Sequence, residues 1–205
     1  MVNILIFRTD RIGDLIVSCP VIFTIKKYFK ECKITLITSD KNYDYAKSLS
    51  IFTHIYKFPK KNFFDKILLI KKLRESKFDY IFILDGKERS IISSLFINSK
   101  IKIALSQKVE SIYKISKINF FLDDENTNLN EIFQKMLDFS NINTKIKNYD
   151  FLVNKKDNNF SEKIPINKYI HIHLDEKWFT DMYINSYIDI NPKYDDFVNF
   201  INDMS

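Results

Sequence analysis

The residues best suited to chemistry lie near the N-terminus, in the stretch Arg8–Pro20, which reads RTDRIGDLIVSCP. Asp14 follows Gly13 directly, and Asp10 and Arg11 belong to the same loop. A carboxylate at such a place can act as a general base, and the planar guanidinium group of arginine suits phosphate and carboxylate ligands. The chain contains only two glycines, so we expect a glycine to stand where a side chain does not fit.

A strand and a helix must hold this loop. The apolar run Asn3–Phe7 precedes it and the helically spaced segment Leu15–Phe29 follows it, which predicts the first strand, loop and helix of an α/β domain. The pattern recurs later in the chain. The apolar run Phe78–Leu84 predicts a buried strand, and the charged loop Asp85–Ser90 (DGKERS) that follows contains the second glycine, Gly86.

Strand and helix patterns alternate along the first two thirds of the chain. Further strands are predicted over Lys33–Thr38, His54–Phe58 and Lys100–Leu105. Helices are predicted over Asn42–Leu49, Asn62–Lys77, Ile91–Ile97 and Leu129–Phe139. This alternation indicates an α/β fold, a Rossmann-like parallel sheet with helices on both faces. In such sheets the ligand crevice lies beyond the carboxyl ends of the strands, where both glycine loops belong.

Composition limits the class of protein. A hydrophobic fraction of 45% is enough for a packed core, which argues against a disordered chain. Cys19 and Cys32 are too few for a disulfide framework or a zinc cluster. The N-terminus lacks the features of a signal peptide, and no apolar run is long enough for a membrane span, so we expect a cytoplasmic protein.

The segment Lys57–Lys77 is basic and carries interleaved phenylalanines. Within it, one side of the predicted helix carries Phe64, Ile67, Leu68 and Lys71. Such a helix can lie on an anionic membrane surface. A helix with a solvated lysine face explains the segment at least as well, since lysine is abundant throughout the chain. Nucleic acid is a third partner class, but no recognised nucleic-acid-binding module is present.

Each candidate residue also has a plain structural interpretation. Asp14 could be a helix-start acid, and Gly13 an ordinary turn glycine rather than one that lets a ligand approach the helix N-terminus. Three of only four arginines lie in the two glycine loops. These could pair with neighbouring aspartates, Asp85 among them, but for Arg11 and Arg89 we favour ligand binding.

The chain changes character after residue 153. Residues 154–165 are polar and charged and end near a proline, which predicts a linker between an N-terminal domain over 1–153 and the start of a second domain over 166–205. In the second domain, His171 and His173 alternate on one predicted strand, Lys168–His173. No third ligand with suitable spacing accompanies them, so we predict no metal site.

The sequence resembles glycosyltransferase family 9, the lipopolysaccharide heptosyltransferases and their relatives. The resemblance rests on the first strand and RTDRIGDLIVSCP, then on the DGKERS loop after a buried strand, and then on KIKIAL. It extends loosely to IHIHLDEKW, which is similar to the opening of the family's second domain. Members of the family are much longer than this chain, so the resemblance implies that the second domain is incomplete.

The resemblance implies the N-terminal half of a GT-B fold and an inverting, metal-independent sugar transfer. The donor would be a nucleotide-sugar similar to ADP-heptose, with no other cofactor, and the acceptor a cell-envelope glycolipid such as the lipopolysaccharide core. Asp14 matches the family's general base and Lys177 a donor-phosphate contact. The acceptor site would include five residues: Gly13, Arg11, Asp10, Gly86 and Arg89. Such an acceptor implies peripheral contact with the inner face of the cytoplasmic membrane and no nucleic-acid partner.

Two other functions remain open. The chain could be an acceptor-binding domain or a degenerate remnant without catalysis. The missing half of the second domain has three explanations: the sequence is a fragment of a longer product, it is a reading-frame remnant, or another chain supplies that half. It could also be a flavodoxin-like nucleotide-binding domain, which would hold phosphate or flavin at the Gly13 loop.

Overall fold

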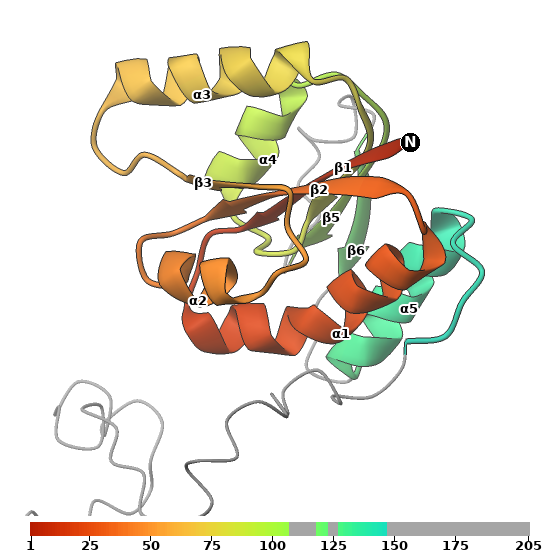
Figure 1. The fold of residues 1–205 in the computed structure, drawn as a ribbon. Coiled ribbons are helices and arrows are strands. Elements are labelled where there is room, and N and C mark those ends of the chain that lie inside the picture. The colour runs from red at the N-terminus through yellow and green to blue at the C-terminus, as the bar shows by residue number, and fades with distance from the viewer. Residues whose placement is uncertain (107–117, 123–126, 147–205) are drawn as a thin grey trace, which may run out of the picture. The chain divides into compact units, whose positions relative to one another are not determined.

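A computed structural model describes residues 1–106, 118–122 and 127–146, all within the predicted N-terminal domain. The described chain forms a parallel sheet of six strands with helices on both faces (Figure 1). The strands are β1 (Val2–Arg8), β2 (Cys32–Thr38), β3 (His54–Lys57), β4 (Phe78–Ile83), β5 (Ser99–Ser106) and β6 (Asn119–Leu122). The helices are α1 (Ile12–Tyr28), α2 (Tyr43–Ser48), α3 (Phe63–Glu75), α4 (Glu88–Leu95) and α5 (Leu129–Phe139). The predicted fold class is therefore confirmed.

The strand order β3-β2-β1-β4-β5-β6 places the first strand in the middle of the sheet. From β1 the chain builds outward through β2 and β3 on one side, and then returns to add β4, β5 and β6 on the other. The loops after β1 and β4 consequently leave the sheet side by side at the point where the order reverses. In open α/β sheets this switch point is where ligands bind.

The central strand β1 joins two separate cores. Ile4 and Ile6 face the core beneath α1 and α5, whereas Leu5 and Phe7 face the core beneath α3 and α4. All four side chains are fully buried, and burial of each contributes about 1.5–3 kcal/mol before the entropic cost of folding is deducted. A continuous apolar run is what a strand covered on both faces requires.

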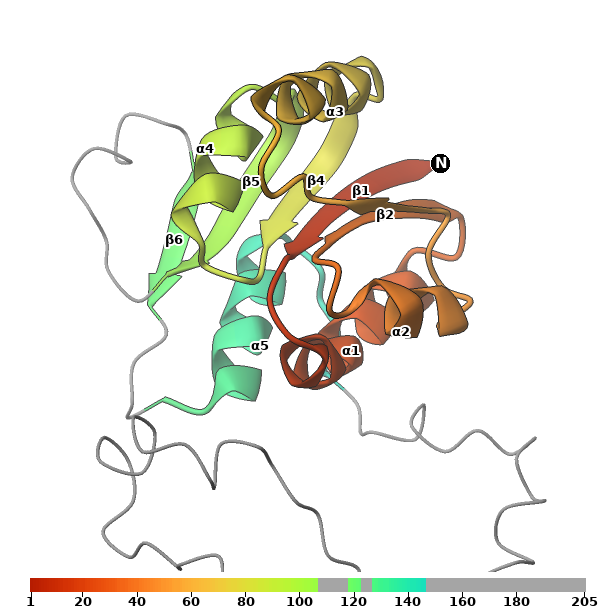
Figure 2. The same ribbon diagram turned by 90° about the vertical axis from the view of Figure 1, so that its left-hand side faces the viewer.

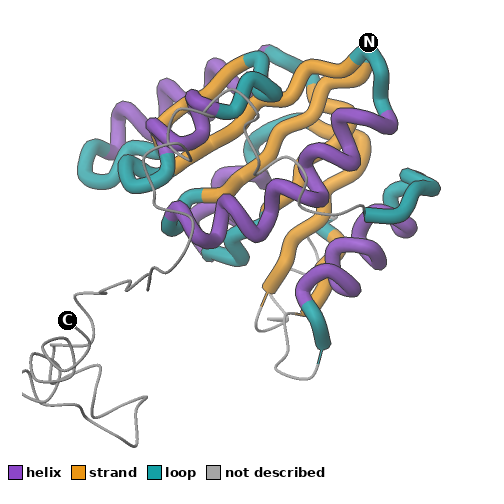
Figure 3. Tube along the Cα trace, turned by 60° about the horizontal axis from the view of Figure 1, so that its bottom comes forward, coloured by secondary structure: helices purple, strands orange, loops and turns teal. Residues whose placement is uncertain are grey.

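The helices divide between the two faces of the sheet. α1, α2 and α5 cover one face, and α3 and α4 cover the other (Figures 1 and 2). The tube in Figure 3 shows the same layering, with the strands between two sets of helices. Among the described residues, none of the helices has the length and apolar character needed to span a bilayer.

The predicted elements are present, but several boundaries differ. Helix α1 begins at Ile12 rather than Leu15, because the Asp14 carboxylate accepts a hydrogen bond from the Arg11 main-chain nitrogen and completes the first turn. Helix α4 begins at Glu88, earlier than the predicted start at Ile91. No strand is predicted over Asn119–Leu122, where the structure has β6.

Helix α3 is apolar on more than the face that it buries. Its Leu73 is buried, and Leu69 and Ile70 pack against the same core. Phe64 and Leu68, which share a side in the sequence pattern, instead remain 75% and 63% exposed. The helix thus presents an apolar surface that nothing in the described part of the chain covers.

Candidate functional site

Two adjoining hollows lie beyond the carboxyl ends of the central strands. The first, of about 480 Å³, is lined by residues that include Asp10, Arg11, Asp14, Arg89 and Lys87. The second, of about 380 Å³, shares Asp10, Asp14 and Lys87 with it and also reaches Gly86. Of the residues singled out from the two glycine loops, all except Gly13 therefore line these hollows at the switch point of the sheet.

The loop after β1 is tied to the loop after β4 by the carboxylate of Asp85. Its Oδ2 accepts hydrogen bonds from the Thr9 main-chain nitrogen (3.1 Å) and the Thr9 hydroxyl (2.6 Å). The same oxygen accepts a hydrogen bond from the Ser90 hydroxyl (2.7 Å), and the other carboxylate oxygen, Oδ1, accepts one from the main-chain nitrogen of Lys87 (3.2 Å). Bonds to a charged acceptor are stronger than neutral ones, so one side chain fixes both loops and the start of α4.

Arg8, the last residue of β1, makes a second link, between the end of β4 and the first turn of α1. Its guanidinium group, only 6% exposed, donates to the Leu84 carbonyl oxygen and, through Nε, to the Asp14 carbonyl oxygen at 2.9 Å. It also pairs with the Asp10 carboxylate at 3.2 Å. For Arg8, therefore, the ion-pair interpretation is the correct one, and its role here is to hold the site together.

Asp14 sits in the first turn of α1 with its carboxylate at the edge of both hollows. Its Oδ2 accepts the bond from the Arg11 nitrogen at 3.0 Å. Within the part of the chain that the structure describes, Oδ1 accepts no hydrogen bond from another residue. Asp14 is thus a helix-start acid, as its plain structural interpretation requires, and it still has an oxygen available to take a proton from a ligand.

Asp10 occupies a more enclosed position between the hollows. Its side chain is 14% exposed, and its Oδ1 is buried without a hydrogen-bond partner among the described residues. Burial raises the pKa of Asp10 to about 6, against an ordinary value of 3.8; Arg8 opposes the rise, and the charges of Asp14 and Asp85 add to it. Asp10 therefore exchanges its proton closer to neutral pH than an ordinary aspartate does.

Positive charge dominates the first hollow. Its lining carries five basic side chains, Arg11, Lys41, Lys60, Lys87 and Arg89, against two acidic ones. Arg89 donates from Nη2 to the Thr9 carbonyl and hydroxyl oxygens, both at 2.9 Å, and its guanidinium group lies 5.6 Å from the centre of the Phe58 ring. The hollow is suited to an anionic ligand that also offers hydroxyl groups.

The lysines of the first hollow were not identified from the sequence. Lys41 and Lys60 belong to segments after β2 and β3, and only the strand order brings those segments beside the Gly13 loop. The Ser39 hydroxyl fixes this approach by donating to the Asp10 carbonyl oxygen at 2.5 Å. Lys87 stood within the DGKERS loop and could have been selected with Arg89.

The two glycines differ in whether the surrounding structure leaves room for a side chain. Gly86 has a φ of +57°, and a Cβ added there would lie 2.9 Å from the Leu105 carbonyl oxygen, so no side chain fits. At Gly13 a Cβ would meet nothing within 4 Å. The expectation that a side chain would not fit is therefore correct for Gly86 and wrong for Gly13, since no described residue would contact a Cβ there.

The remaining predicted site residue, Lys177, lies outside the described residues, as do His171 and His173. Among the residues that are described, no group of three histidine, cysteine or acidic side chains is arranged to hold a metal ion. Cys19 and Cys32 are both free and buried.

Replacing Gly86 with alanine should lower the free energy of unfolding by about 1–3 kcal/mol, because alanine is strained at positive φ and its methyl group would overlap the β5 backbone. Gly13→Ala is the matched control and should change stability by less than about 0.5 kcal/mol. Chemical denaturation measures both values. An equal loss of unfolding free energy in the two variants would contradict the conclusion that only Gly86 lacks room for a side chain.

The buried carboxylate of Asp10 predicts a particular pH dependence. The pKa of Asp10 is about 6 in the folded protein, against the ordinary value of 3.8 that applies to the unfolded chain. Between pH 3.8 and about 6 the folded chain therefore binds more protons than the unfolded one. The contribution of Asp10 to stability therefore falls as the pH rises through this window. Asp10→Asn, which keeps an oxygen for Arg8 but carries no charge, should gain stability relative to the parent chain across the same window.

Denaturation of both proteins at a series of pH values measures this difference. Asp44→Asn, which removes an exposed acid from the first turn of α2, is the control and should show no such trend. A constant difference between Asp10→Asn and the parent chain from pH 3.8 to about 6 would contradict the raised pKa.

No family model and no curated protein matches the sequence. Solved structures do match the fold. The E. coli heptosyltransferase WaaC with ADP-2-deoxy-2-fluoro heptose aligns with a TM-score of 0.58 at 11% identity, covering 72% of this chain and 50% of that one. The same enzyme with ADP aligns with a TM-score of 0.56 at 10% identity, covering 72% and 49%.

A glycosyl transferase of family 9 from Veillonella parvula DSM 2008 aligns with a TM-score of 0.59 at 15% identity, covering 80% of this chain and 50% of that one. The present chain thus spans about half the length of the solved structures that it matches. Its described residues have the Rossmann-like α/β fold of the N-terminal portion of GT-B heptosyltransferases.

Proposed function

We propose that this protein is a glycosyltransferase of the heptosyltransferase type, whose described half binds the sugar acceptor. The observation that carries the proposal is the convergence of Asp14, Asp10, Arg11 and Arg89 on one basic hollow at the switch point of the sheet. The fold that the chain shares with heptosyltransferases supports the same conclusion. The donor is a nucleotide-sugar similar to ADP-heptose, and the acceptor is a glycolipid such as the lipopolysaccharide core.

In the proposed reaction Asp14 is the general base. Its unengaged oxygen takes the proton of an acceptor hydroxyl group as the hydroxyl oxygen attacks the anomeric carbon of the donor sugar. The bond from that carbon to the nucleoside diphosphate breaks, the diphosphate leaves with the electron pair, and the sugar is transferred with inversion. No metal takes part in this proposal, and charge on the leaving diphosphate is met by the second domain, where Lys177 is the proposed contact.

The other residues bind and orient the acceptor. Arg11, at the N-cap of α1, and Arg89, in the first turn of α4, supply cationic donors to the first hollow. Gly13 leaves open space at the N-terminus of α1, where main-chain N–H groups can approach an anionic or hydroxyl-rich ligand. Gly86 lets its loop pass close to β5, and Asp10 adds a carboxyl group between the hollows. An acceptor anchored in lipid would bring the protein to the inner face of the cytoplasmic membrane.

Replacing Asp14 with asparagine tests the base directly. In a transfer assay with ADP-heptose and a lipopolysaccharide-core acceptor, Asp14→Asn should reduce kcat by roughly 100-fold or more, because asparagine cannot accept the proton. The dissociation constant of the acceptor should change little, since the amide oxygen can still accept the Arg11 bond. Asp44→Asn, at the equivalent turn of α2, should retain the parent activity.

Turnover by Asp14→Asn at the parent rate would show that another group is the base. The assay also separates the two other functions. A parent chain that binds the acceptor in calorimetry but transfers no sugar would be an acceptor-binding domain. One that binds flavin mononucleotide and no oligosaccharide would be a flavodoxin-like domain.

A further inference from the structure

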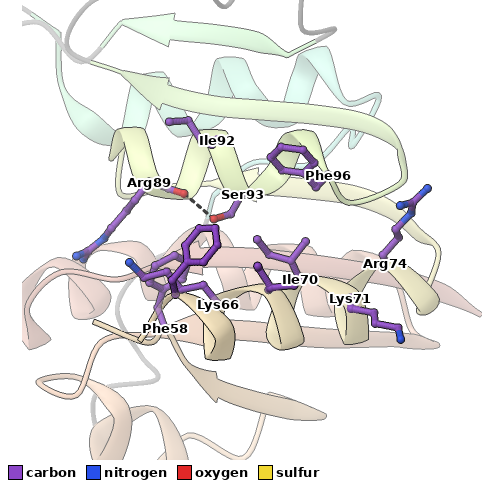
Figure 4. Close-up of a pocket in the computed structure, with 11 residues that line it drawn as sticks. Phe58, Lys66, Ile70, Lys71, Arg74, Arg89, Ile92, Ser93 and Phe96 are labelled. Atoms are coloured by element: carbon purple, nitrogen blue, oxygen red, sulfur yellow. Dashed lines mark hydrogen bonds between the residues drawn. The ribbon is translucent and has the colours of Figure 1, made fainter. Parts of the chain in front are cut away.

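A second, largely apolar groove is lined by residues of α3 and α4 (Figure 4). These two helices lie on the face of the sheet opposite α1 (Figure 1). The groove has a volume of about 730 Å³. Ile70 lines it from α3, and Ile92 and Phe96 line it from α4 and its C-terminal end (Figure 4). The charged ends of Lys71 and Arg74 lie at its margin rather than within it (Figure 4). The groove is thus apolar inside and basic at the rim.

Exposed apolar side chains lie within the groove, at Phe63 and Phe96, and also outside its lining on α3, at Phe64 and Leu68. Phe63, Phe64 and Leu68 are 68%, 75% and 63% exposed, and Phe96 beyond α4 is 60% exposed. Single exposed apolar residues are ordinary on a protein surface, but a contiguous group of large ones marks a surface that meets an apolar partner. Because Leu73 is the only fully buried side chain of α3, packing within the described residues does not account for the other apolar residues of the helix.

The charge around this surface is not a result of overall composition. The segment Lys57–Lys77 contains eight basic and two acidic residues, a net charge of +6, which equals that of the whole chain. The other residues hold twenty-four basic and twenty-four acidic side chains. Lys57 and Lys60 pair with Asp40, which lies outside the segment. An abundance of lysine throughout the chain would raise basic residues everywhere, so the remaining excess of basic residues in this one segment needs a separate cause.

The charge of the rim is also available. Lys66, Lys71 and Arg74 form no ion pair within the described part of the chain, where the salt bridges involve other basic residues. Large apolar side chains between free cations on a surface helix are typical of helices that lie in the interface of an anionic bilayer. Lysine and arginine near such a surface are attracted to its headgroups while apolar side chains enter the acyl boundary.

We propose that the face formed by α3, α4 and the groove between them docks on a bilayer of anionic lipid. Phe63, Phe64 and Leu68 enter the acyl boundary, and the basic rim contacts the headgroups. Arg89 lines both this groove and the first hollow, so docking brings the entrance of the candidate site to the headgroup layer. This proposal rests on the proposed function for one point, that the bilayer is the inner face of the cytoplasmic membrane. Binding to vesicles can be measured without sugar transfer.

Sedimentation of the whole chain with vesicles tests this surface. We expect binding to vesicles of phosphatidylcholine and phosphatidylglycerol mixed in about equal parts, and at least about tenfold weaker binding to phosphatidylcholine alone. Added salt should weaken the binding, because it screens the headgroup charge. Asp14→Asn should bind as the parent chain does, so loss of transfer and loss of docking are distinguishable.

Two paired variants locate the docking face. Phe63→Ser with Phe64→Ser should weaken vesicle binding about tenfold or more, whereas Phe139→Ser, at an exposed phenylalanine of α5 on the opposite face, should not. Lys71→Gln with Arg74→Gln should weaken it more than Lys27→Gln with Lys30→Gln, which removes two exposed charges at and beyond the end of α1. These side chains are exposed, and circular dichroism confirms that each variant is folded.

Three results would overturn the proposal. The parent chain could fail to bind the anionic vesicles. The two pairs of charge variants could lose binding equally, which would indicate adsorption without a specific face. The phenylalanine pair could convert a dimer to a monomer without affecting vesicle binding, and the surface would then belong to a second copy of the chain.

Discussion

The candidate site depends on the Asp85 carboxylate. Thr9 and Asp85, in the loops after β1 and β4, are 76 residues apart in the sequence, yet the Asp85 carboxylate accepts hydrogen bonds from the main chain and hydroxyl of Thr9. It also accepts one from Ser90, in the first turn of α4. Arg8 adds a second link by donating to the Leu84 and Asp14 carbonyl oxygens. Parallel strand order brings the loops together, and these charged contacts then set their spacing. The candidate site residues are consequently held in place by Asp85 and Arg8, whose own side chains are fixed by several hydrogen bonds.

Within that frame the two aspartates of the Gly13 loop have different environments. Asp14 lies at a helix start, where a main-chain N–H group holds one oxygen and leaves the other toward the hollows. Asp10 is enclosed beside Arg8, and burial raises its pKa. Two carboxyl groups whose environments differ can divide the tasks of accepting and holding a proton. The sequence places both in one loop but does not distinguish them, because burial depends on residues far along the chain.

The fold was predictable because each helix and strand has a recognisable pattern in its own stretch of sequence. Continuous apolar runs such as Phe78–Leu84 and helical spacing such as Leu129–Phe139 each report their own element, and their alternation reports the parallel sheet. The contacts that complete the site are not local. Lys41 and Lys60 reach the first hollow only through the order of the strands, and the openness around Gly13 depends on what its neighbours leave unfilled. The apolar side of α3 that carries Phe64 and Leu68 was visible in the pattern, but its exposure was not, since spacing alone cannot show which side meets the sheet.

The central claim is that the Gly13 and Gly86 loops form one ligand site held by Asp85. A titration of the labelled protein with deacylated lipopolysaccharide-core oligosaccharide, followed by nuclear magnetic resonance, tests it most directly. If the two loops form one site, the amide signals of Gly13, Asp14, Gly86 and Lys87 should shift together with a single dissociation constant. Shifts confined to one loop, or different constants for the two loops, would contradict it.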